Sequence, residues 1–137
     1  MSTFDFFKAQ VRHRNFTQFM RSLIHSDVIN EKDIIVQIAR SSFDVHVQDV
    51  IGTLTTGATL VMLHPGGIFD FEYLADVMKQ KNITWITTVP TMLQNFFTFL
   101  KQTNNLKAIR CLGSICSAGM RPLHEASYSV LFSTVSR

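Results

Sequence analysis

The chain has 137 residues, enough for one domain of ordinary size with its own buried core. Hydrophobic residues make up 46% of it and charged residues 17%, a balance that excludes a disordered tail. The formal net charge is +3, and no long Lys/Arg stripe interleaves with aromatic residues, so a nucleic-acid partner is not expected.

The two cysteines, Cys111 and Cys116, are too few for a disulfide framework and lack the spacing of zinc ligands. We therefore expect buried, reduced thiols. No apolar run approaches the roughly 20 residues of a membrane span, and the first ten residues lack the apolar core of a signal peptide. A membrane partner is not expected, and a cytoplasmic location follows by default.

The N-terminal segment, residues 1–10, shows no clear period and is left unassigned. Asn15 is predicted to cap a helix that runs to about His25, with Gln18 completing a capping box. The buried stripe of this helix is Phe16, Phe19, Met20, Leu23 and Ile24. Residues 33–39 (DIIVQIA) then predict an interior strand that leads into a loop at residues 41–44.

A second helix is predicted after this loop, opened by Asp44 and ended by Gly57 in the left-handed conformation. The apolar positions at i, i+3, i+4 and i+7 predict that it has one buried face, formed by Val47, Val50, Ile51 and Leu54. Residues 58–63 (ATLVML) are almost continuously apolar, which predicts a strand covered on both faces.

In the next part of the chain, predicted helices and strands continue to alternate. After the loop signal HPGG at residues 64–67, Asp70 is predicted to cap a helix whose apolar stripe is Phe71, Leu74, Ala75 and Met78. Residues 83–88 predict a third strand, which Pro90 ends. A further helix is lined by Met92, Leu93, Phe96, Phe97 and Leu100.

The last predicted elements are a weaker strand at residues 109–115, a turn at residues 118–119 and a final helix that begins with Pro122. Strands that alternate with helices predict an α/β fold with a mainly parallel sheet. In such sheets, ligands bind beyond the carboxyl ends of the strands. The loops at residues 41–44, 87–91 and 116–121 are therefore the candidate site.

Four segments, in order, resemble the motifs of one family. VRHRN (residues 11–15) is similar to the V-x-H-x-N motif, and SSFDVHVQDVIGTLTTGATLVM (41–62) contains a counterpart of the FDxS segment. ITWITTVPTML (83–93) resembles the ITxxxxPPS/T strand and helix, and SICSAGMRPL (114–123) resembles the GGE-A-L turn. The chain thus resembles amino-acid adenylation domains of nonribosomal peptide synthetases, in the AMP-dependent synthetase and ligase superfamily.

The resemblance has two departures. The family's glycine-rich phosphate loop should lie just before Val11, yet the first ten residues contain no glycine. The later ribose-binding and lysine-bearing segments have no counterpart after Ala126. The expectation is a partial AMP-binding domain at residues 11–126, part of the N-terminal subdomain of an adenylate-forming enzyme. A non-matching tail follows at 127–137, and the chain alone should be inactive.

In the resembled enzymes, a substrate carboxylate attacks the α-phosphate of ATP with Mg²⁺, and pyrophosphate leaves. The aminoacyl adenylate then passes to the phosphopantetheine thiol of a carrier protein. The resemblance implies that Asp44 meets the substrate ammonium group, whereas the residues alone favour a helix N-cap at this position. It implies no catalytic residue and no metal ligand in this chain.

The resemblance also implies a side-chain pocket formed by Val45, Gln48, Thr87, Cys116 and Ala118, and an adenine-binding turn at Gly119 and Met120. From the residues alone, Gln48 could face water, Cys116 and Ala118 could simply pack, and Gly119 could only permit a tight turn. No role is assigned to His46.

Other classes of protein remain as alternatives. A fragment of an acyl-CoA-type ligase would lack the partner for an ammonium group. A non-catalytic α/β interaction module would use exposed strand edges and apolar helix faces, and self-association through such a surface is a further expectation. A flavodoxin-like domain is disfavoured because no glycine-rich turn joins a first strand to a helix.

Overall fold

The computed structural model describes residues 11–117. They form a four-stranded, fully parallel sheet in the order β2-β1-β3-β4. The strands are β1 (Ile34–Gln37), β2 (Thr59–Met62), β3 (Trp85–Thr88) and β4 (Ser114–Ser117). The predicted α/β class with a parallel sheet is confirmed.

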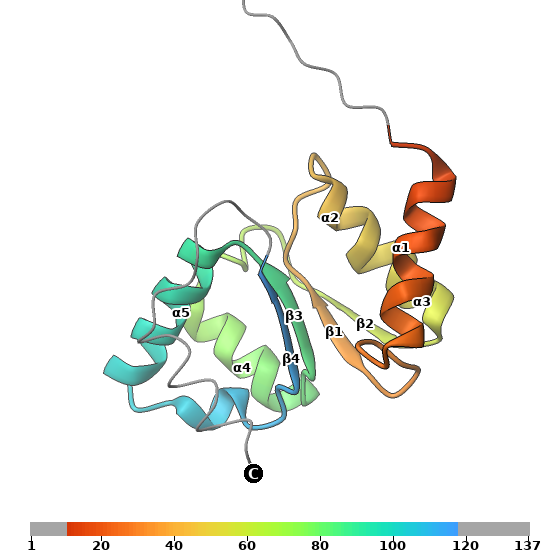
Figure 1. Cartoon of the computed structure of the whole chain (residues 1–137). Coiled ribbons are helices and arrows are strands. Elements are labelled where there is room, and N and C mark those ends of the chain that lie inside the picture. The colour runs from red at the N-terminus through yellow and green to blue at the C-terminus, as the bar shows by residue number, and fades with distance from the viewer. Residues whose placement is uncertain (1–10, 118–137) are drawn as a thin grey trace, which may run out of the picture.

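Helices cover both faces of this sheet (Figure 1). On one face lie α1 (His13–His25), α2 (Asp44–Val47) and α3 (Thr53–Thr56), with a π-helical segment, Gln48–Gly52, joining α2 to α3. On the other face lie α4 (Phe71–Lys81) and α5 (Pro90–Gln102), followed by a short 3-10 helix, Leu106–Ile109. The result is a three-layer sandwich. Because the strands are parallel, all four end at the same edge of the sheet.

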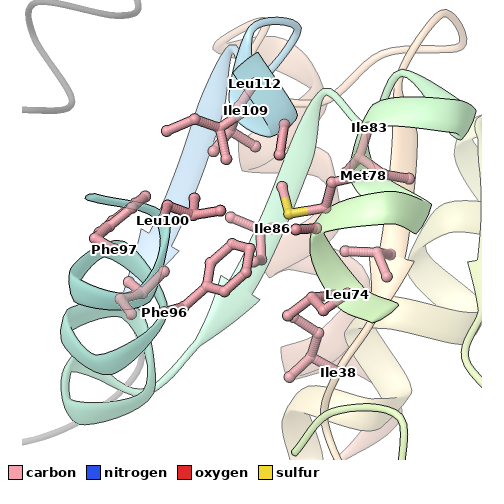
Figure 2. Close-up of a cluster of buried hydrophobic side chains, with 14 residues drawn as sticks. Ile38, Leu74, Met78, Ile83, Ile86, Phe96, Phe97, Leu100, Ile109 and Leu112 are labelled. Atoms are coloured by element: carbon pink, nitrogen blue, oxygen red, sulfur yellow. The ribbon is translucent and has the colours of Figure 1, made fainter. Parts of the chain in front are cut away.

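The larger core fills the space between the sheet and the helices α4 and α5 (Figure 2). Leu74 and Met78 from α4 and Phe96 and Leu100 from α5 converge on Ile86 of β3, and each is at most 1% exposed. The predicted stripes of both helices are thus confirmed. Because side chains of this size each gain about 1.5 to 3 kcal/mol on burial, this layer contributes most of the hydrophobic stabilisation.

A smaller core lies on the opposite face, where Met20 of α1 packs with Ile29, Ile35, Ala58 and Trp85. The predicted stripe of α1 is only partly buried, because Phe19 and Ile24 are 44% and 46% exposed.

The start of α1 differs from the prediction. The helix begins at His13, and Asn15 is its third residue, whose side chain accepts a hydrogen bond from the Arg12 N–H at 3.1 Å. Asn15 is therefore not the N-cap. In α4, by contrast, the Asp70 carboxylate accepts the Tyr73 N–H at 3.0 Å, which confirms the predicted cap.

The helical stretch after β1 has the predicted ends but not the predicted orientation. It runs from Asp44 to Thr56 and stops at Gly57, which has a φ of 80°. Its apolar stripe faces outward, with Val47, Ile51 and Leu54 exposed by 43%, 47% and 63%.

The face of this helical stretch that packs inward consists instead of Asp49, Gly52 and Thr53, which are buried. A Cβ at Gly52 would lie 2.9 Å from the Met20 methyl carbon. Small side chains therefore allow a close approach to α1 that branched apolar residues would prevent.

Two strand predictions need correction. β2 is an edge strand rather than one covered on both faces, and Thr59 and Met62 are exposed. The last strand begins at Ser114 instead of residue 109, because residues 106–109 form the 3-10 helix. The predicted turn at 118–119 and the helix at Pro122 lie outside the described residues.

The cysteines are free thiols, but both are partly exposed, so the expected full burial is wrong. Cys111 lies at the sheet's periphery, where its Sγ donates to the Asn82 Oδ1 at 3.4 Å. In the part of the chain from residue 11 to residue 117, no helix has the length and apolar character needed to cross a membrane.

Candidate functional site

A cavity of about 490 Å³ lies at the carboxyl edge of the sheet, beyond the ends of β1 and β3. This volume falls within the usual range of small-molecule sites. Its walls are mostly apolar, with few polar groups. The lining residues are Ile38, Ala39, Arg40, Phe43, Asp44, Val45, Ile68, Phe69, Thr87, Thr88, Val89 and Met92.

Asp44 lines this cavity from the first turn of α2 and is exposed to solvent. Its Oδ1 accepts the N–H of the next residue, Val45, at 2.9 Å. The N-cap position belongs to Phe43, and no side chain caps the helix. The N-cap alternative for Asp44 is therefore wrong. Its carboxylate lines the cavity and also accepts one of the free N–H groups in the first turn of α2.

Thr87 lines the same cavity from β3. Its side chain is buried, and its hydroxyl oxygen accepts a hydrogen bond from the Trp85 indole N–H at 2.8 Å. This bond fixes the orientation of the threonine. Asp44 and Val45 thus share one cavity with Thr87, which lies far from them in the sequence.

Two of the three predicted loops meet here, those after β1 and β3. A loop that sequence reasoning did not include also takes part, because Ile68 and Phe69 come from the connection after β2. Since β2 is parallel to its neighbours, the same rule about strand ends would have identified this loop.

Arg40 is a second residue that the sequence did not single out. Its guanidinium carbon lies 5.2 Å from the centre of the Phe69 ring, a cation–π arrangement across the cavity rim. Arg40 and Asp44 form no ion pair with each other in the described part of the chain, residues 11–117. The rim therefore presents one positive and one negative group to a ligand.

Other predicted pocket residues do not line the cavity. Gln48 is half-buried in the π-helical segment, and Cys116 packs at the edge of the smaller core. Burial raises the pKa of the Cys116 thiol, and the nearby Asp49 carboxylate raises it further. Ala118, Gly119 and Met120 lie outside the described residues. Across residues 11–117 no group of three or more His, Cys, Asp or Glu side chains could hold a metal ion.

Comparison with known proteins agrees with this architecture. The family described as AMP-binding enzyme matches residues 9–135. The chain belongs to this family.

The similar curated proteins are nonribosomal peptide synthetases. Phosphinothricin tripeptide synthetase PhsB of Streptomyces viridochromogenes is 37% identical over 90 residues, which is 64% of this chain and 8% of that protein. A mycosubtilin synthase polypeptide of Bacillus subtilis is 27% identical over 131 residues, 92% of this chain and 5% of that protein. The resemblance to adenylation domains is thus confirmed, and the chain spans less than a tenth of either relative's length.

Solved structures share the fold. The nonribosomal peptide synthetase FmoA3 has a TM-score of 0.78 and 21% identity over 90% of this chain and 13% of that chain. A malonyl-CoA ligase bound to methylmalonyl-CoA and AMP has a TM-score of 0.68 and 22% identity over 88% of this chain and 26% of that chain. These similarities place the sheet and its helices within the adenylation-domain fold.

Proposed function

We propose that this chain contributes the amino-acid pocket of an ATP-dependent ligase that activates an amino acid as its aminoacyl adenylate. The observation that carries the proposal is the cavity shared by Asp44, Val45 and Thr87 at the carboxyl edge of the sheet. An apolar cavity with a carboxylate at its mouth suits a ligand with an apolar side chain and an ammonium group.

The charges at the rim support an α-amino acid over a plain carboxylic acid. A zwitterion carries an ammonium group for Asp44 and a carboxylate for Arg40, whereas a plain acid would leave Asp44 without a counter-charge. In this role the chain positions the substrate carboxylate for attack on the α-phosphate of ATP, and catalysis follows chiefly from positioning.

The cosubstrates and partners of the whole enzyme are part of this proposal. ATP would enter as its Mg²⁺ complex, and the acceptor would be the phosphopantetheine thiol of a carrier protein. The similarity to mycosubtilin synthase and PhsB supports this assignment. An acyl-CoA-type ligase is the competing function, and Asp44 separates the two because only an amino acid needs its charge.

The test is a chimera in which residues 11–117 replace the matching segment of a complete adenylation domain. The chimera should catalyse amino-acid-dependent exchange of pyrophosphate into ATP, and Asp44→Ala should lower the rate of this exchange at least several-fold. Arg21→Ala, an exposed change on α1, is the matched control and should leave the rate unchanged. The proposal is contradicted if a folded chimera activates plain carboxylic acids as readily as amino acids. It is also contradicted if Asp44→Ala leaves the exchange rate unchanged.

A further inference from the structure

Asp49 is a buried carboxylate that the proposed binding of substrate does not use. It lies in the π-helical segment and is only 1% exposed. Its Oδ2 accepts the Ala39 N–H at 3.3 Å, while its Oδ1 is buried without a hydrogen-bond partner among the described residues. Burying a carboxylate in this way is costly, so an apolar side chain would pack here at a lower cost.

The carbonyl group of Ala39 is hydrogen-bonded as well as its N–H. Its carbonyl oxygen accepts a hydrogen bond from the Gln37 Nε2 at 2.6 Å. The His46 Nδ1 lies 3.3 Å from the same carbonyl oxygen and 3.2 Å from the Gln37 Nε2. Side chains of β1 and of the helix that follows therefore hold Ala39 at both its N–H and its C=O.

Ala39 lies where these hydrogen bonds can influence the candidate site. Ala39 follows β1 directly, lines the cavity and begins the loop that carries Asp44. π-Helical segments are rare and are found frequently at functional sites. Because α2 begins only five residues beyond Ala39, a fixed Ala39 also fixes where the Asp44 carboxylate meets the cavity.

We infer that Asp49 is a positioning residue: by accepting the Ala39 N–H, it holds the base of the β1–α2 loop and so places Asp44 at the cavity mouth. The importance of Asp44 rests on the proposed function, but the structural effect of Asp49 does not. The titratable groups that face Asp49 are His46, on its own helical stretch, and Cys116, on β4.

Amide hydrogen exchange on the full 137-residue chain tests this inference. Asp49→Leu keeps the branched shape at Cγ but removes the acceptor, and the Ala39 amide should then exchange about tenfold faster. Asp49→Asn retains an acceptor oxygen and should restore the protection. Thr53→Val is the matched control, because Thr53 is equally buried and bonds only the Asp49 main-chain carbonyl; it should leave Ala39 protected.

Unchanged Ala39 exchange in Asp49→Leu would overturn the inference, as would an equal loss of protection in Thr53→Val. If Asp49→Leu does not fold, the smaller Asp49→Ala takes its place, and its Ala39 amide must exchange faster than that of Asp49→Asn. A second arm measures the affinity for an amino acid by titration, which should fall in Asp49→Leu and recover in Asp49→Asn. If no amino acid binds the unmodified chain, the proposed function fails, while the exchange result still decides the role of Asp49.

Discussion

At the scale of single residues, Asp49 has the most unusual chemistry in the described chain. Desolvation by burial raises its pKa from 3.8 to about 6, although the amides of Ala39 and Ile38 and the charge of His46 oppose the shift. The folded state thus favours the neutral acid. The contribution of Asp49 to stability is complete below about pH 4 and is lost as the pH rises through about 6.

Asp49→Asn, which cannot ionise, should remove this pH dependence. Since one pKa unit corresponds to about 1.4 kcal/mol, the unfolding free energy of the unmodified chain should fall by about 3 kcal/mol relative to the variant between about pH 3 and pH 7. Urea denaturation at several pH values measures the difference. Parallel curves for the two proteins would show that Asp49 is not desolvated.

The sequence identified Asp44 but not Asp49, for a physical reason. Asp44 lies in a recognisable motif at the end of a predicted strand, where ligands are expected. Asp49 lies opposite an apolar stripe, and helical periodicity assigns such a polar residue to the solvent. Only the fold shows that small and polar residues form the inward side of this helix.

At the scale of the elements, the same inversion predicts which substitutions the fold tolerates. Leu54 is 63% exposed, so Leu54→Ser should change the unfolding free energy by less than about 0.5 kcal/mol. Leu93 of α5 is fully buried, and Leu93→Ala should cost about 2 to 5 kcal/mol. Thermal denaturation of the two variants compares them directly, and a larger loss for Leu54→Ser would contradict the outward orientation of the stripe.

The C-terminal end of α3 depends on a glycine. Gly57 has a φ of 80°, a conformation that costs an ordinary residue roughly 1 to 2 kcal/mol. Gly57→Ala should therefore destabilise the chain by about that amount in urea denaturation. Gly113→Ala is the control, because Gly113 is exposed and the nearest atom to an added Cβ, the Thr84 carbonyl oxygen, is 3.8 Å away. Equal effects of the two changes would refute the left-handed cap.

The helices of the larger core could be predicted well because each has a single apolar stripe, and that stripe packs against the sheet. Leu74, Met78, Phe96 and Leu100 recur at helical spacing, and all face the sheet. The edge position of β2 could not be predicted in this way, since an apolar run does not reveal which strands flank it. The boundary of β4 was missed because Ile109 is buried by a 3-10 helix rather than by a strand.

At the scale of the whole molecule, strand-end topology is what creates the site. Four parallel strands deliver their following loops to one edge, and three of these loops enclose the cavity that contains Asp44 and Thr87. The alternation of strands and helices predicted this edge. The size of the cavity and the opposing charge of Arg40 depend on side-chain packing between loops, which no local pattern encodes.

The most direct measurement of the central claim is an NMR titration of the full chain with an amino acid and with the same molecule lacking its amino group. The amino acid should bind more tightly, and Asp44→Asn should weaken it by about fivefold, as expected for an exposed charge pair, without affecting the plain acid. Equal affinity for both ligands in the unmodified chain, or an equal effect of Asp44→Asn on both, would contradict an amino-acid pocket at this edge of the sheet.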